Sequence, residues 1–395
     1  MTPLESCQQA TARPPWVAPT VPGPGPARPA RPASIWQAAA MRGVWRRRTV
    51  GLLAGAALLA AGCRTPGGGR PGGDQGPPVR LNEIQVLASH NSYHVEPEPV
   101  LMDALTAFLG DEALGFGYTH RPLAEQLDAG VRQIELDVFV DDPEGGRYAS
   151  PALGPALGLA PVDPALAEPG LKVLHVQEVD FRSTCATFTA CLTDVREWSD
   201  ANPGHLPVTI QVEAKDGAIP DPGFGFVVPP PWDAAAFAQL EEEIRSVFPT
   251  ERILTPGDVR GRHRTLAAAV RAGRWPTLDE ARDKVMFVLD DTGAKRDTYR
   301  ALVPELDDRL IFVDVPETDP DAAVFVVNDP VRDADRIRDL VEEGFLVRTR
   351  ADADTREART GDTTRRDAAL ASGAHFVSTD YVWPDERLGT GYAVD

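Results

Sequence analysis

Cysteine and basic residues are both scarce in this chain. Only four of its 395 residues are cysteines, and 40 lysines and arginines face 59 aspartates and glutamates, which gives a formal net charge of −19. Residues 1–62 contain seven arginines and one glutamate, so the rest of the chain carries −25. This acidity argues against nucleic acid as a partner, because binding to phosphates requires clustered positive charge. It also opposes docking on an anionic lipid surface.

The N-terminal segment is predicted to lie outside the folded domain. Residues 1–40, rich in Pro, Ala and Arg, show no hydrophobic periodicity and are predicted to form a disordered leader. Residues 41–62 are typical of an export signal, because a basic stretch precedes an apolar run (50–61) too short to span a bilayer. The run 58–63 resembles the bacterial lipobox, with Cys63 as the lipidated residue. Residues 63–80 are predicted to form a Gly-rich tether.

Export is therefore the predicted destination of the chain. The lipobox-like run indicates a bacterial lipoprotein anchored to the membrane at Cys63, and ordinary secretion is the alternative. Met41 is a candidate for the true start, in which case the leader is not translated. No segment after the export signal is apolar enough to be a transmembrane helix.

The remaining cysteines are predicted to form a disulfide. Cys7 falls in the leader and Cys63 in the lipobox, which leaves Cys185 and Cys191, six positions apart and before a predicted helix. In an exported domain such a pair favours a short disulfide over a metal or redox site. No other cysteine is available to complete a metal site.

Short apolar runs bounded by turn residues predict nine strands, and amphipathic segments between many of them predict helices. The strands are 84–88, 131–140, 171–176, 207–212, 285–289, 310–313, 323–327, 345–347 and 375–378; the helices are 122–129, 188–200, 233–248, 330–343 and 363–372. Their alternation predicts an α/β fold with a parallel sheet. Eight such units close into a (β/α)8 TIM barrel over residues 81–395, so nine candidates compete for eight places.

A doubly wound open sheet is the alternative fold. No Gly-rich dinucleotide turn follows the first predicted strand, which favours the barrel. The active site of a barrel lies at the carboxyl ends of its strands, and the polar motifs of this chain occur there. The Gly- and Pro-rich residues 217–231 are predicted to form a long loop that contributes to a rim over the site.

Acidic residues at strand ends predict a metal site. Glu135 and Asp137 are two residues apart on one strand and therefore project from the same face. Asn91 follows the first predicted strand and Glu213 ends the fourth, so four oxygen ligands converge. This ligand set suits Ca2+, and Mg2+ less well, rather than Zn2+. A solvated strand end with exposed acids is the alternative.

Two histidines occur in the same setting. His90 follows the first strand and His175 closes the third, so both are predicted to reach the barrel mouth. Because imidazole titrates near neutrality, the pair is predicted to exchange protons with a nucleophile and a leaving group. Four other histidines do not lie beside the acidic strand ends and are predicted to be structural, although residues 118–120 are candidates for lining the pocket. These histidines are His94, His120, His205 and His263.

Three further residues are candidates for substrate binding. Lys215 shares the strand face of Glu213 and would place a cation where a phosphate binds, with a surface lysine as the alternative. Arg350 and Asp380 end the last two predicted strands and are predicted to hold phosphate and hydroxyl groups.

The motifs together resemble the catalytic barrel of phosphoinositide-specific phospholipase C, most closely its bacterial Ca2+-dependent branch. The runs that carry the resemblance are 89–93 (Ser-His-Asn-Ser-Tyr), 135–137 (Glu-Leu-Asp), 173–175 and 210–215. The resemblance implies cleavage of phosphatidylinositol-type lipids to diacylglycerol and a cyclic inositol phosphate. The catalytic roles that it implies fall to His90 and His175, and the metal ligands to Asn91, Glu135, Asp137 and Glu213.

The chain departs from the family pattern after Asp137. Eukaryotic enzymes continue with Trp-Asp-Gly, whereas residues 138–140 are Val-Phe-Val here, so headgroup contacts do not transfer. Metal-independent bacterial relatives replace the ion with an arginine, but here the four oxygen ligands are retained, which favours Ca2+.

Two other functions remain open from the sequence. A glycerophosphodiester phosphodiesterase acts on soluble diesters with the same kind of barrel, but that family begins with His-Arg-Gly rather than His90-Asn91-Ser92. A surface lipoprotein that binds Ca2+ and inositol without turnover is the non-enzymatic alternative. The sequence gives no indication of oligomeric state.

Overall fold

The computed structural model describes residues 77–395. The leader, the export signal, the lipobox cysteine and most of the tether lie outside the described residues. Among the helices of residues 77–395, none combines the length and apolar character needed to span a membrane.

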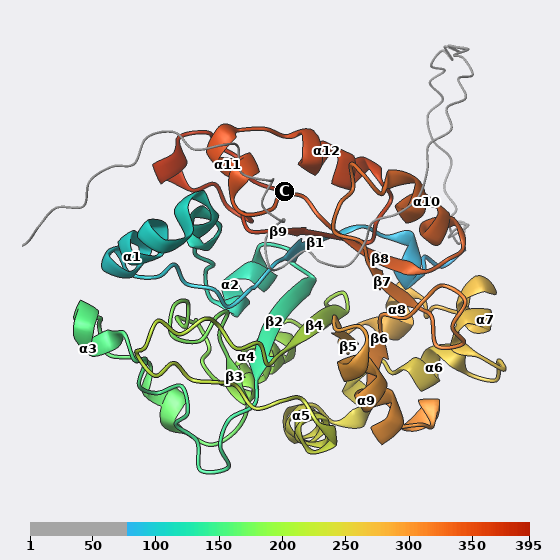
Figure 1. Cartoon of the computed structure of the whole chain (residues 1–395). Helices are drawn as coiled ribbons and strands as arrows, with labels where there is room; N and C mark the ends of the chain where they lie inside the picture. Colours follow the sequence, from blue (N-terminus) through green and yellow to red (C-terminus); the bar gives the residue numbers. More distant parts are fainter. Residues whose placement is uncertain (1–76) are drawn as a thin grey trace, which may run out of the picture. The chain divides into compact units, whose positions relative to one another are not determined.

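Eight parallel strands form a nearly closed barrel (Figure 1). They are β1 (Val86–Ser89), β2 (Gln133–Phe139), β4 (Val208–Lys215), β5 (Val285–Leu289), β6 (Ile311–Val313), β7 (Val324–Val326), β8 (Leu346–Arg350) and β9 (Phe376–Thr379). Hydrogen bonding follows the order β6-β5-β4-β2-β1-β9-β8-β7, and within the described sheet the three-residue strands β6 and β7 are its two ends. The predicted α/β barrel is confirmed, with one open seam.

One of the nine predicted strands, 171–176, does not belong to the parallel barrel. The run 171–176 contains only β3 (Lys172–Val173), which pairs antiparallel with the outer end of β2. Val173 lies opposite Val138, and Lys172 lies opposite Phe139. The sequence left open which of the nine candidates has no place in the barrel, because a short apolar run has the same pattern in a parallel and in an antiparallel strand. The antiparallel course carries the chain back along β2 toward Asp137.

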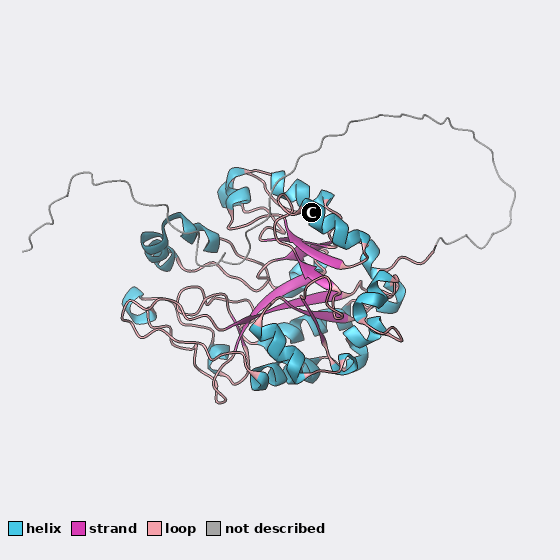
Figure 2. Ribbon diagram, turned by 45° about the vertical axis from the view of Figure 1, so that its right-hand side comes forward, coloured by secondary structure: helices cyan, strands magenta, loops and turns pink. Residues whose placement is uncertain are grey.

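Helices and turns fill the connections between strands, and Figure 2 shows helices over one side of the sheet and long loops extending from the other. The α-helices are α1 (Pro99–Leu109), α2 (Leu123–Asp128), α3 (Gly154–Leu157), α4 (Phe188–Ala201), α5 (Ala234–Val247), α6 (Pro256–Arg260), α7 (Leu266–Arg271), α8 (Leu278–Ala281), α9 (Ala294–Leu302), α10 (Ala334–Glu342), α11 (Arg356–Thr360) and α12 (Thr364–Ala371). The 3-10 turns are η1 (Leu81–Glu83), η2 (Gly110–Phe116), η3 (Pro164–Ala167), η4 (Thr250–Arg252), η5 (Leu306–Asp308) and η6 (Glu386–Leu388). The five predicted helices correspond to α2, α4, α5, α10 and α12.

Local sequence explains where the two longest helices begin. Thr187 precedes α4, and its hydroxyl accepts a hydrogen bond from the backbone N–H of Ala190. Asp233 precedes α5 and accepts from Ala236 in the same way. Each side chain satisfies a backbone donor that the first helical turn leaves unpaired.

Strand β2 separates the apolar core from a polar barrel interior. Ile134, Leu136 and Val138 are fully buried within the main hydrophobic core. Glu135 lies between them in sequence, and its carboxylate contacts the guanidinium of Arg348 on β8, which is not a neighbour of β2 in the sheet. Since side chains alternate along a strand, the residues flanking Leu136 face the barrel interior.

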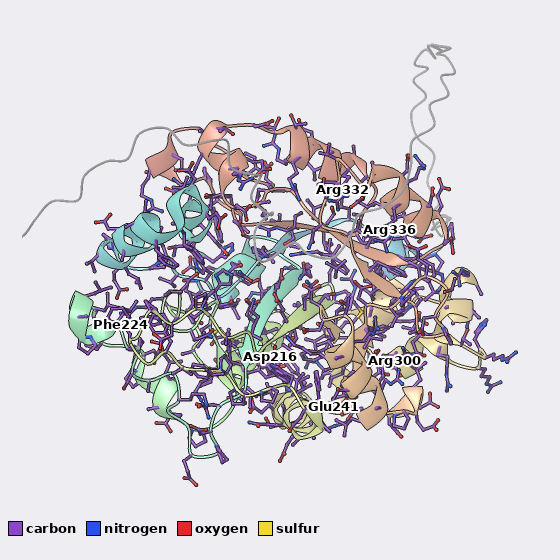
Figure 3. The ribbon with its side chains drawn as sticks, viewed as in Figure 1. Asp216, Phe224, Glu241, Arg300, Arg332 and Arg336 are labelled. Carbon is purple, nitrogen blue, oxygen red and sulfur yellow. A yellow bond between two sulfur atoms is a disulfide. The ribbon has the colours of Figure 1, made fainter. Side chains whose placement is uncertain are left out.

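The disulfide and the long loop predicted from the sequence are both present. Cys185 and Cys191 form the predicted disulfide immediately before and within α4. The predicted 217–231 loop exists, and the carboxylate of Asp221 accepts hydrogen bonds from four successive backbone N–H groups, those of residues 223–226. Phe224, which is 53% exposed, lies at the periphery of the molecule, whereas Asp216 lies near the end of β4 (Figure 3). The loop is tied to the turn after β3, because Gln177 Nε2 donates to the carbonyl of Gly217 (2.8 Å) and the backbone N–H of Val227 donates to Glu178 Oε1 (2.9 Å). Its contribution to a rim over the site stays a prediction.

Candidate active site

Parallel strand register brings the predicted site residues together in pairs. Asp137 on β2 is the register partner of Glu213 on β4. The backbone N–H of His90 donates to the carbonyl of Thr379 (3.0 Å), which extends the β1–β9 ladder and places His90 beside Asp380. Neighbouring parallel strands present paired residues on the same face, so both pairs meet at the carboxyl end of the barrel.

A compact carboxylate cluster lies inside the barrel mouth. Oxygen atoms of Glu135, Glu213 and Asp290 all lie within 4.8 Å of one another. Asp290 directly follows β5, and its backbone N–H donates to the carbonyl of Val212 (2.9 Å). Gln211 Nε2 donates to Asp290 Oδ2 (2.9 Å) and thereby orients this carboxylate. Sequence reasoning missed Asp290, although an acidic residue immediately after a strand is the signal that identified Asp380.

The residues present fit a hard divalent cation. Asn91 Oδ1 and both carboxylate oxygens of Asp137 are buried and accept no hydrogen bond. Burial, together with the charges of Glu213 and Glu135, raises the pKa of Asp137 well above its usual range. Burial and the charge of Glu135 also raise the pKa of Asp290. Unpartnered oxygens in an excess of negative charge are the setting that a Ca2+ ion satisfies.

Two cations already contact this cluster. Lys215 Nζ lies 3.1 Å from Glu213 Oε1 and 3.2 Å from Asp137 Oδ2, the latter an ion pair without hydrogen-bond alignment. Burial alone would lower the pKa of Lys215, but the charges of Asp137 and Glu213 outweigh it and raise that pKa. Lys215 is therefore fixed among the acids in this structure, and its predicted contact with phosphate stays a prediction.

Arg348 was not identified from the sequence. Its buried guanidinium contacts the Glu135 carboxylate and the side-chain oxygen of Asn328, and its Nη2 donates to Ser378 Oγ (3.1 Å). The carboxylate of Glu135, a predicted metal ligand, is thus already paired with an arginine that reaches across the barrel from β8.

His90 contacts a carboxylate at one ring nitrogen and a guanidinium at the other. Its Nδ1 donates to Asp380 Oδ1 (2.6 Å), and its Nε2 accepts from Arg350 Nη1 (3.2 Å). Arg350 Nη2 also donates to Asp380 Oδ2 (3.0 Å). Burial would raise the pKa of Asp380, but the charge of Arg350 and the hydrogen bond from His90 outweigh it and hold that pKa below its usual range. Asp380 and Arg350, predicted as substrate contacts, therefore contact the predicted catalytic histidine directly.

A second carboxyl group supports Asp380 from behind. Asp352 Oδ1 accepts a hydrogen bond from the backbone N–H of Asp380 (2.8 Å), and its other oxygen accepts from the hydroxyl of Thr379. Burial and the neighbouring charge of Asp380 raise the pKa of Asp352 to about 7. This carboxyl fixes the turn after β9 from which Asp380 projects.

His175 has its own carboxylate partner. Its Nδ1 donates to Asp180 Oδ2 (2.7 Å), and its side chain is 22% exposed, whereas Asp180 is fully buried. Asp180 also accepts a hydrogen bond from His94. The prediction that His94 lacks a site setting is therefore wrong. Its partner Asp180 lies 86 positions further along the chain, so the residues next to His94 give no sign of this contact.

The remaining histidines agree better with the structural prediction. His205 binds Ser199 Oγ (2.6 Å) beside α4, and His263 has no site partner in the described part of the chain. His120 Nε2 donates to the carbonyl of His90 (2.8 Å), and burial lowers the pKa of His120 to about 4. A pocket of about 320 Å³ lies next to this contact, lined in part by Thr119, His120 and Asp380. Residues 119 and 120 thus line a pocket that shares Asp380 with the site, whereas Tyr118 is not among its lining residues; that residues 118–120 line the substrate pocket stays a prediction.

The site geometry agrees with the family comparison. The family model for Ca2+-dependent phosphoinositide phospholipase C matches residues 79–395. The chain belongs to this family. The protein is therefore a Ca2+-dependent phosphodiesterase of phosphoinositide lipids, and Ca2+ is its metal ion.

Solved structures of several phospholipases C are similar to this chain. They include the Ca2+-dependent enzyme of Pseudomonas sp (16% identity, 76% of this chain and 90% of that one, TM-score 0.48) and that of Streptomyces antibioticus (20%, 76% and 95%, 0.48). The phosphatidylinositol-specific enzyme of Listeria monocytogenes is 10% identical over 80% of this chain and 93% of that one, with a TM-score of 0.44. No curated protein matches the chain.

Asp290 is expected to be a Ca2+ ligand of this phospholipase. The substitution Asp290→Asn removes one negative charge from the cluster and should weaken Ca2+ binding by about tenfold or more, as measured by isothermal titration calorimetry. Asp291→Asn is the matched control, because Asp291 pairs with Lys295 (3.1 Å) and lies outside the cluster. Equal affinities of the two variants would remove Asp290 from the ligand set.

Proposed function

We propose that this phospholipase cleaves phosphatidylinositol-type lipids to diacylglycerol and a cyclic inositol phosphate. The observation that carries this proposal is the pair of histidines at the barrel mouth, each of which donates Nδ1–H to a buried carboxylate. The acidic cluster of Glu135, Glu213 and Asp290 lies in the same mouth. Two proton-exchanging groups and a cation site are what an internal displacement at phosphorus requires.

The two histidines present equivalent atoms to the substrate. Because Nδ1 of His90 is occupied by Asp380 and Nδ1 of His175 by Asp180, Nε2 is the reactive nitrogen of each ring. A ring hydroxyl of the inositol attacks the phosphorus while the bond to the diacylglycerol oxygen breaks. The lone pair on His175 Nε2 accepts the proton lost by the hydroxyl. Once the phosphate has taken the place of the Arg350 contact, His90 has to carry a proton on Nε2, and it gives this proton to the leaving oxygen.

The charged residues around His90 and Glu213 orient the phosphate. Arg350 contacts His90 Nε2 in this structure and is the cation nearest to that reactive nitrogen, so a bound phosphate would take the place of this contact. Asn91, Glu135, Asp137, Glu213 and Asp290 are the candidate ligands of Ca2+. When bound, Ca2+ lowers the pKa of the attacking hydroxyl and offsets negative charge on the phosphoryl oxygens.

The reaction product tests this function. The full chain incubated with phosphatidylinositol vesicles should release a cyclic inositol phosphate with Ca2+, less with Mg2+ and none with a chelator. Release of a non-cyclic phosphate from glycerophosphoinositol, without action on the vesicles, would instead identify a glycerophosphodiester phosphodiesterase. Inositol and Ca2+ binding without any product would identify a binding protein.

Removal of either histidine should abolish most of the activity. His90→Ala and His175→Ala are each expected to lower kcat by about 10²–10⁴-fold, the usual contribution of a positioned acid or base. His263→Ala serves as the control, because His263 lies outside the site and should leave kcat unchanged. Full activity in either site variant, measured on the same vesicles, would exclude that histidine from catalysis.

Export and anchoring at Cys63 are part of the proposal. The supporting observations are the apolar run 50–61, the lipobox-like run 58–63 and the Gly-rich stretch before the barrel. Cells that express the chain with a labelled fatty acid should incorporate the label into the membrane fraction. Cys63→Ala should abolish labelling, while Cys7→Ala should retain it; labelling of the Cys63 variant would contradict the anchor.

A further inference from the structure

His94 lies at the centre of a buried network that the family resemblance does not describe. Its side chain is completely inaccessible to solvent, and its ring stacks on Tyr118 with ring centres 4.2 Å apart. Nδ1 lies 3.0 Å from the carbonyl oxygen of Tyr118, and Nε2 lies 2.8 Å from Asp180 Oδ2. Both ring nitrogens are therefore opposite an oxygen that can only accept a hydrogen bond.

Two acceptor partners fix the protonation of His94. A neutral imidazole has one N–H and one lone pair, so it can satisfy only one of these oxygens. Donation to both requires the imidazolium form, with a proton on each nitrogen. Both N···O distances, 3.0 and 2.8 Å, lie within hydrogen-bond range, so the geometry by itself requires the second proton.

Asp180 occupies a fixed position between the two histidines. A tight turn returns the chain to β3, with mutual backbone hydrogen bonds between Val176 and Asp180 (2.8 and 2.9 Å). Oδ2 of the carboxylate accepts from both His94 Nε2 (2.8 Å) and His175 Nδ1 (2.7 Å). Burial would raise the pKa of Asp180, but the His94 charge and both hydrogen bonds lower it, so the carboxylate stays ionised.

His175 is the only member of the network that reaches solvent. Of the charged and titratable groups near it, Asp180 accepts its Nδ1–H, while Lys215 and His94 oppose a second proton on the ring. Phe116 covers another side, with ring centres 5.6 Å apart. Burial lowers the pKa of His175 despite the hydrogen bond to Asp180. The ring is therefore neutral near pH 7, with the lone pair on Nε2.

We propose that His94 is a positioning residue for His175, a role that rests on the proposed function of His175. As a buried imidazolium, His94 holds and neutralises the Asp180 carboxylate, which in turn fixes His175 in the Nδ1–H tautomer with Nε2 directed at the substrate. A neutral histidine in water prefers a proton on Nε2, so the reactive tautomer has to be imposed by this network. In the serine-protease triad, a wrong tautomer of the catalytic histidine reduces kcat by about 10⁴-fold although the geometry is retained.

The same three side chains also have the composition of a transition-metal site, since their ligand atoms lie within 4.8 Å of one another. A metal ion would need an unprotonated nitrogen on His94, yet both nitrogens of His94 face acceptors that require a proton. The hydrogen-bond pattern therefore favours the charge network over a metal site.

The first test determines the protonation states in the unsubstituted protein. In the full chain with 15N-labelled histidine at pH 7, imidazole nitrogen shifts should show His94 protonated on both nitrogens and His175 protonated on Nδ1 alone. Single His→Gln variants assign the signals. An Nε2–H tautomer of His175, or a neutral His94, would overturn the proposal whatever the activity of the enzyme.

Substitution provides the second test. His94→Gln keeps one donor to Asp180 but removes the charge, so the neutral Nδ1–H form of His175 should no longer predominate, and kcat should fall by at least about tenfold with little change in KM. Asp180→Asn should abolish the same tautomer if His94→Gln does not fold. His375→Gln is the matched control: His375 is buried and bound at both nitrogens, to the backbone of Val347 and Asn82, at the other end of the barrel.

The control distinguishes positioning from a loss of stability. His375→Gln should leave the His175 signal and kcat unchanged even if it lowers the melting temperature. An unchanged His175 signal in both His94→Gln and Asp180→Asn would refute the proposal. If His175→Ala retains activity while the wild-type tautomers are as expected, the proposed function of His175 fails but the network stands.

Discussion

The buried contact between Arg348 and Glu135 is the constraint on which the site depends. It joins β8 to β2 across the barrel interior, and both side chains are almost completely buried. Such a pair is costly to desolvate, and loss of one partner typically destabilises a protein by about 3–5 kcal/mol because a bare charge remains. A barrel filled with Val, Ile and Leu would avoid this cost. Here the interior is polar, and Glu135 contacts Arg348 while it lies close to the carboxylates of Glu213 and Asp290.

The register of the parallel strands brings together site residues that are far apart in the sequence. Register pairs Asp137 with Glu213 and aligns His90 with Asp380, so backbone hydrogen bonding alone brings the members of each pair side by side. The antiparallel strand β3 adds what the parallel strands cannot supply. It returns along β2 and thereby brings His175 and Asp180 to the barrel mouth from outside the parallel sheet.

The sequence was informative where one motif lies on one strand end. Glu135 and Asp137 share a face by alternation, and Asn91 follows β1, so a local pattern was sufficient to place them. Contacts between distant segments leave no such pattern: Arg348 meets Glu135 across 213 positions and His94 meets Asp180 across 86. The true direction of β3 was also hidden, because an apolar run of this length does not specify its partner. Asp290 was detectable, since it directly follows a strand as Asp380 does.

Charge balance connects the two histidine networks to the need for a divalent ion. When all its carboxyl groups are ionised, the mouth contains six carboxylates, those of Glu135, Asp137, Asp180, Glu213, Asp290 and Asp380. They face four cations, which are Arg348, Lys215, Arg350 and the proposed His94 imidazolium. Arg350 neutralises the partner of His90, and His94 neutralises the partner of His175, so both dyads are balanced locally. Arg348 and Lys215 then face the four remaining acids. Two negative charges are left, which one Ca2+ ion would neutralise, and the oxygens without a hydrogen bond, those of Asp137 and Asn91, belong to the same set of candidate ligands.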